Sequence, residues 1–84
     1  MSEDARRREI RDLLGSIVGP DLVSTIGDDD LIFEHGLIDS LHLIELIELL
    51  QGRFGFEIEM DELAPENFES LSAMARYVST KTPQ

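Results

Sequence analysis

The chain has 84 residues, a formal net charge of −11 and no cysteine. This length predicts a single small domain over residues 1–84, without room for a large enzyme pocket, and the lack of cysteine excludes disulfides and thiolate zinc sites. No apolar run approaches the roughly 20 residues that cross a bilayer. The N-terminal segment lacks the apolar core and cleavage site of a secretory signal, so we expect a cytoplasmic protein that does not enter a membrane.

The negative charge lies mainly in the middle of the chain. Residues 21–70 hold fourteen acidic residues and a single basic one, Arg53, whereas residues 1–20 carry balanced charge. Such a surface repels nucleic acid and anionic lipid and attracts partners with basic patches. A solvated acidic face that only aids solubility is the alternative interpretation.

The first predicted element is a helix from about Glu3 to Val18. Its apolar residues fall at helical spacing and form one stripe: Ile10, Leu13, Leu14, Ile17 and Val18. Gly19 and Pro20 end this helix, because glycine tolerates the left-handed cap and proline cannot continue the hydrogen-bond ladder.

The following connection, residues 20–39, is long and too apolar to lie in water. We expect it to cross the bundle with part of its apolar set buried: Leu22, Val23, Ile26, Leu31, Ile32, Phe33, Leu37 and Ile38. Within it, Asp28, Asp29 and Asp30 are interpreted as the cap of a single helical turn that Gly36 closes. The spacing after Asp28 does not supply the ligands of a calcium loop, so we predict no metal site.

The second main helix is predicted to begin at "GLIDSL", residues 36–41, and to end near Phe54 and Gly55. One face carries the apolar residues Leu43, Ile44, Leu46, Ile47, Leu50 and Phe54, with Ile44 at its edge. The opposite face carries Leu41, His42, Glu45, Glu48, Leu49 and Gly52. Leu41 is either an apolar anchor for a basic partner or a residue that packs against the long connection.

The remaining chain predicts a connector and two further helices. Phe56, Ile58 and Met60 alternate with acids, and we interpret them as an extended connector that buries its apolar residues. A short helical piece follows around Pro65, and Ser70 caps the last helix. Its apolar residues are Leu71, Met74, Ala75 and Val78.

The predicted fold is therefore all-α. We expect a small antiparallel bundle of three main helices plus one short helix, with a long loop between the first two main helices. The ordered core is expected over about residues 3–79, and the polar tail, residues 80–84, is expected to fray.

The Asp-Ser pair of "GLIDSL" has two interpretations. Aspartate is a common N-cap, so Asp39 can simply start a helix. No nucleophile triad is evident, because neither His35 nor His42 comes with a spaced acid that would mark a hydrolase. We therefore predict no catalytic residues, and a Ser40 hydroxyl displayed in the first helical turn for another enzyme.

At this point the chain resembles the acyl carrier protein family. The resemblance joins "GLIDSL", the acidic second helix, "FGFEIEMDEL" and "FESLSAMARYV" in one order, and it reaches from the first helix to Val78. It implies that a phosphopantetheinyl transferase moves 4′-phosphopantetheine from coenzyme A onto Ser40, with Asp39 beside it. It also implies that partner enzymes meet Leu41, Ile44, Glu45 and Glu48.

By this resemblance the protein is not an enzyme but a stand-alone, monomeric carrier of a thioester-linked group. Its other partners would be a loading ligase and acyl-using enzymes with basic docking patches. His42 and Glu48 depart from fatty-acid carriers, so the pathway stays open among fatty acid, polyketide and specialised acyl or aminoacyl biosynthesis. The alternative function is an acidic helical interaction module that is never modified.

Overall fold

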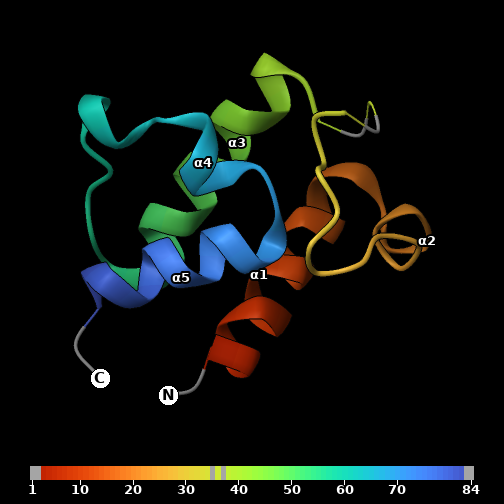
Figure 1. The fold of residues 1–84 in the computed structure, drawn as a ribbon, viewed down its shortest axis with the longest axis horizontal. Coiled ribbons are helices and arrows are strands. Elements are labelled where there is room, and N and C mark those ends of the chain that lie inside the picture. The colour runs from red at the N-terminus through yellow and green to blue at the C-terminus, as the bar shows by residue number, and fades with distance from the viewer. Residues whose placement is uncertain (1–2, 35, 37, 83–84) are drawn as a thin grey trace.

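The computed structural model describes residues 3–34, 36 and 38–82, and in these residues the chain is helical without strands. The three main helices are α1 (Glu3–Val18), α3 (Ser40–Phe54) and α5 (Leu71–Lys81). Three short elements lie between them: α2 (Pro20–Val23), the 3-10 turn η1 (Met60–Glu62) and α4 (Pro65–Phe68) (Figure 1). The predicted all-α bundle is confirmed, although the single short helix that we expected is accompanied by α2 and η1.

The end of α1 follows from its two terminal residues, as predicted. The Gly19 N–H bonds the Gly15 carbonyl at 2.8 Å, and the Gly19 backbone then takes a φ of 103° that side chains other than glycine rarely adopt. Pro20 occupies the first turn of α2, where its missing N–H costs no hydrogen bond. The chain therefore turns away from α1 and begins a second, short helix.

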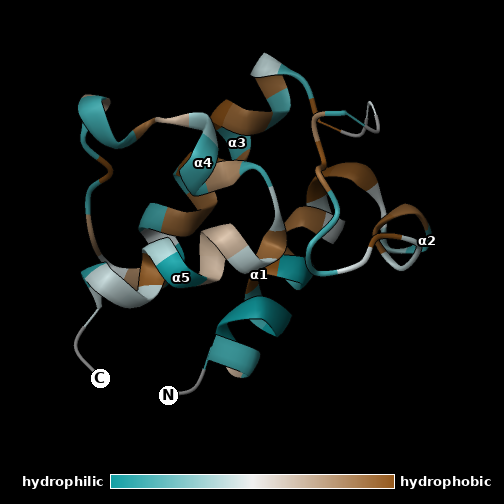
Figure 2. Ribbon diagram, in the orientation of Figure 1, coloured by the Kyte–Doolittle hydropathy of each residue, from teal (hydrophilic) through white to brown (hydrophobic). Residues whose placement is uncertain are grey.

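The core forms where α1, α3 and α5 pack against one another. α1 contributes Ile10 and Leu14, α3 contributes Leu46 and Leu50, and all four side chains are fully buried. From α5 come Leu71, Met74, Ala75 and Val78. Burying one such large aliphatic side chain contributes about 1.5–3 kcal/mol to the free energy of unfolding. Figure 2 shows the first turns of α1 as hydrophilic, which agrees with the charged residues there.

The long connection crosses the bundle, as expected, with four buried apolar side chains: Val23, Ile26, Ile32 and Ile38. Arg11 of α1 anchors it by donating to the Val23 carbonyl at 2.7 Å and to the Asp28 carboxylate at 2.8 Å. On the other side, the Ser72 N–H bonds the Asp28 carbonyl at 2.9 Å. The connection is thus held between α1 and α5.

The predicted role of the aspartate run as a helix cap is wrong. The Asp28 carboxylate pairs with Arg7 and Arg11 instead, and the Asp30 carboxylate accepts the Gly27 N–H at 2.7 Å. The described residues of 31–36 form turns rather than a helix, with Gly36 at a φ of 71°. The Asp28 carboxylate is thus engaged by the arginines of α1 rather than by the N-terminus of a helical turn.

The expected burial of the 56–60 connector is right for two of its three apolar residues. Phe56 and Ile58 pack partly buried against the core, whereas Met60 is 85% exposed. The reason is a capping box, in which the Glu59 and Glu62 side chains each accept the other residue's backbone N–H. This turn starts η1 at Met60 and directs its side chain outward.

The last helix begins as predicted and ends later than expected. The Ser70 hydroxyl oxygen accepts the Ala73 N–H at 3.1 Å, which caps the start of α5. The helix then continues to Lys81, into the segment of residues 80–84 that we expected to fray. Lys81 pairs with Glu62 of η1, and the Tyr77 hydroxyl donates to the same carboxylate at 2.9 Å. Residues 83–84 of the predicted tail lie outside the described residues.

No helix in the described parts of the chain has both the length and the apolar character to cross a bilayer.

The contact of Glu62 with α5 predicts a pH-dependent stability. The Lys81 ammonium, followed by the Tyr77 hydroxyl, lowers the pKa of Glu62 below its usual 4.5. The carboxylate therefore stabilises the fold above about pH 4.5, and this contribution is lost as the pH falls. We expect Glu62→Gln to lower the midpoint of thermal unfolding near pH 7, measured by circular dichroism, and to lower it less near pH 3.

The matched control is Glu66→Gln, which removes the same charge from an exposed residue of α4 that forms no ion pair with the described residues. An equal effect of both substitutions would contradict the role of the Glu62 contact.

Candidate functional site

The start of α3 is built by the Asp39 cap. Asp39 has extended backbone angles, and its carboxylate accepts the His42 N–H at 2.9 Å. The Asp39 carbonyl accepts the Leu43 N–H at 2.9 Å, so the helical ladder begins at Ser40. In Figure 1 this start lies at the end of the molecule opposite the first turn of α1 and the last turn of α5.

Ser40 is the first residue of α3, and it is exposed. Within residues 3–34, 36 and 38–82 no group forms a hydrogen bond with its hydroxyl, so no base in this part of the chain activates it. An exposed hydroxyl without an internal partner can be reached by a separate enzyme. The geometry thus offers a modifiable side chain rather than a nucleophile with its own catalytic base.

Asp39 places a negative charge directly beside Ser40. The main-chain N–H of His42 lowers the pKa of Asp39 below its usual value, and the His42 ring acts in the same direction. The ring Nδ1 lies 3.3 Å from the Asp39 carboxylate. His42 was placed on the face opposite the core, and one edge of its ring lies against the helix cap.

The predicted partner residues lie together on α3, at the surface. Leu41 is 65% exposed and Ile44 is 55% exposed, and Glu45 and Glu48 are exposed as well. The interpretation that Leu41 packs against the long connection is therefore wrong, and Ile44, which the helical wheel placed at the edge of the core face, lies on the exposed side. Two apolar side chains beside two acids are the pattern that a basic partner with an apolar contact would fit.

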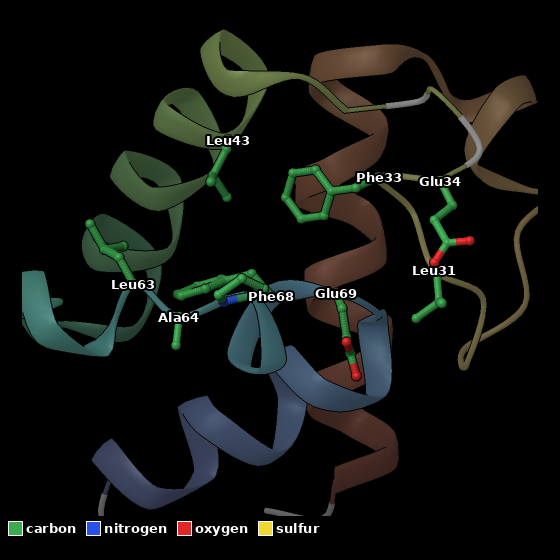
Figure 3. A pocket seen from close by; sticks show the side chains of 9 residues that line it. Leu31, Phe33, Glu34, Leu43, Leu63, Ala64, Phe68 and Glu69 are labelled. Atoms are coloured by element: carbon green, nitrogen blue, oxygen red, sulfur yellow. The ribbon is translucent and has the colours of Figure 1, made fainter.

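Beside α3 lies an open hollow of about 440 Å³ that the sequence did not predict (Figure 3). The sequence did contain an indication of this hollow, namely more apolar residues in the connections than the core takes up. Three of them, Leu31, Phe33 and Leu63, remain exposed and line the hollow. The other lining residues are Glu34, Leu43, Ala64, Pro65, Phe68 and Glu69. The hollow offers mainly apolar contact.

Comparison with known proteins identifies the family. The family model described as "Phosphopantetheine attachment site" matches residues 8–78. The chain belongs to this family of carrier proteins. Its members hold 4′-phosphopantetheine and are carriers rather than catalysts, so this carrier protein is not an enzyme.

Curated relatives and a solved structure agree with this family assignment. The D-alanyl carrier protein of Lacticaseibacillus casei (strain BL23) is 37% identical over 62 residues, which cover 74% of this chain and 75% of the relative. That of Lactococcus lactis subsp. cremoris (strain MG1363) is 32% identical over 78 residues, 93% of this chain and 98% of the relative. The solved chain "Structure of KstB-PCP(apo)" has a TM-score of 0.74 and 31% identity, and the match covers 98% of this carrier protein and 92% of that chain.

The start of α3 fits a serine-linked phosphodiester. The Ser40 side chain is exposed, and it stands at the N-terminus of a helix of 15 residues, where the helix dipole favours a negative group. The nearby Asp39 carboxylate opposes this, but part of its charge is offset by the His42 N–H that it accepts.

The contact of Asp39 with the start of α3 predicts that this side chain stabilises the carrier. Because the pKa of Asp39 is lowered, the charged cap stabilises the fold above about pH 3.8, and the contribution is lost as the pH falls through the lowered value. We expect Asp39→Ala to lower the thermal midpoint near pH 7, and Asp39→Asn to lower it less because asparagine also caps helices. Equal thermal midpoints of wild type and Asp39→Ala near pH 7 would contradict this role.

Proposed function

We propose that Ser40 is the residue to which 4′-phosphopantetheine is attached, and that the protein carries an aminoacyl group on that arm. The observation that supports Ser40 is its exposed hydroxyl at the first position of α3, beside the charged Asp39 and not bonded by any residue that the structure describes. The arm supplies the thiol that this cysteine-free chain lacks, and the thiol holds the cargo as a thioester.

The attachment step needs little from the chain itself. The Ser40 oxygen attacks the phosphorus of coenzyme A that bears the pantetheine part, and the Oγ–phosphorus bond forms as the phosphoanhydride bond breaks. The adenosine bisphosphate part leaves, and the hydroxyl proton passes to the transferase or to water. Asp39 contributes by fixing where α3 begins, because this places the Ser40 hydroxyl at the surface.

Two observations favour an aminoacyl cargo over a fatty acyl chain. The curated relatives named above are D-alanyl carrier proteins, which points to a small amino acid activated by a dedicated ligase. In addition, His42 stands directly after Asp39-Ser40-Leu41, where fatty-acid carriers usually have an acid.

Partner enzymes are proposed to dock on the exposed part of α3. Leu41 and Ile44 provide apolar contact, while Glu45 and Glu48 attract basic residues of the transferase and the ligase. A carrier must leave each enzyme after its turn, and electrostatic attraction gives fast encounter without tight binding. We propose that one such domain, as a monomer, performs this function.

The attachment predicts a defined mass gain. Incubation with coenzyme A, Mg²⁺ and a broad-specificity transferase should add one phosphopantetheine to the intact protein, measured by mass spectrometry. Ser40→Ala should abolish the addition, because no other hydroxyl stands at this position, and should leave the helical circular dichroism spectrum unchanged.

The control is Ser24→Ala, which removes another exposed serine, in the connection after α2, and should be modified like the wild type. Lack of any mass gain on the folded wild type would instead favour the unmodified interaction module. For the cargo, the mass of the species isolated from its native host would identify the loaded group.

The acidic docking residues predict a rate of modification that depends on salt. Replacing both Glu45 and Glu48 by lysine should slow modification most at low salt, where steering between charges is least screened. The measurement is the initial rate of mass gain over a salt series.

The control for this pair is Asp12→Lys with Asp21→Lys, which changes the net charge equally on exposed positions of α1 and α2. If both double variants slow equally, overall charge rather than the α3 surface determines the encounter.

A further inference from the structure

The ring of His42 lies in an unusual place for an exposed histidine. Its side chain is 37% exposed, yet its Nδ1 atom is shielded from solvent and lies 3.3 Å from the Asp39 carboxylate. The same carboxylate oxygen already accepts the main-chain N–H of His42. One residue thus approaches Asp39 with both its backbone and its ring.

This geometry restricts the protonation of the ring. The contact does not have hydrogen-bond geometry, but an Nδ1 without a proton would still bring its lone pair close to the negative carboxylate, and this arrangement is repulsive. With a proton on Nδ1 the contact is attractive, and it is most attractive when the whole ring is positive. No described residue forms a hydrogen bond with this buried atom, and the charged group in contact with it is the Asp39 carboxylate, at 3.3 Å.

The other charged groups near His42 do not compete for Nδ1. On α3 itself Glu45 lies one turn further along and is exposed. In the neighbouring connection, the Glu34 carboxylate points away from the start of α3 (Figure 3). The carboxylate that faces the His42 ring is therefore Asp39.

We propose that His42 is a positioning residue that offsets negative charge at the attachment site, pairing with Asp39 through a protonated Nδ1 and balancing Asp39 once a phosphodiester is attached to Ser40. The second half of this inference rests on the proposed function.

The first half can be tested on the unmodified protein. We expect the ¹⁵N NMR signals of the neutral His42 ring to show the proton on Nδ1, and Asp39→Ser, which can still cap the helix, to move it to Nε2. His35→Gln, which removes the chain's other histidine, identifies the signals. A proton on Nε2 in the wild type would overturn the pairing with Asp39.

The second half is tested on the modified protein by ³¹P NMR between about pH 5.5 and 8, where histidine is the side chain that ordinarily titrates. A phosphodiester keeps one charge in this range, so a shift of its signal reports a neighbouring group. We expect a pH-dependent shift in the wild type and in His35→Gln, and its loss in His42→Gln.

The outcomes separate the two proposals. If mass spectrometry shows no modification, the proposed function fails, while the ¹⁵N result still decides the pairing with Asp39. If the protein is modified but the ³¹P signal does not change with pH, or changes equally in His42→Gln, the role of His42 toward the phosphodiester is overturned.

Discussion

The structure depends on the anchoring of the long connection between α1 and α3. This segment is too apolar to stay in water, and after α2 its described residues form turns and bends rather than helices. Arg11 and Ser72 bond Asp28 from two sides, which holds the connection between α1 and α5. With its path held in place, the connection buries Ile32 and Ile38 and delivers the chain to Asp39 at the surface.

Elements with strong periodicity were predictable from the sequence, whereas details set by tertiary contacts were not. The bounds of α1 follow from its apolar stripe and from Gly19, and the start of α5 follows from Ser70. The pairing of Asp28 with α1 could not be predicted, because it depends on which arginine the folded connection passes. The extension of α5 to Lys81 depends in the same way on a partner in η1.

At the candidate site the sequence located the residues but not their surroundings. The Asp-Ser-Leu motif indicated a cap and a displayed hydroxyl, and the structure has Asp39 in the cap with Ser40 exposed. The helical wheel placed Ile44 at the edge of the core face although it is exposed, and it did not predict the contact of His42 with the cap, since a wheel gives a direction around the axis and not the position of neighbouring elements. The apolar hollow was missed for the same reason.

The placement of Tyr77 has a consequence for spectroscopy. It is the single tyrosine of a chain without tryptophan, so near-ultraviolet absorption and emission come almost entirely from one ring. That ring packs against Phe56 and Phe68 and bonds Glu62, at the point where η1 meets α5. The protein thus contains an intrinsic optical label for this junction. A separation of η1 from α5 can be followed by the signal of Tyr77, without attaching a dye.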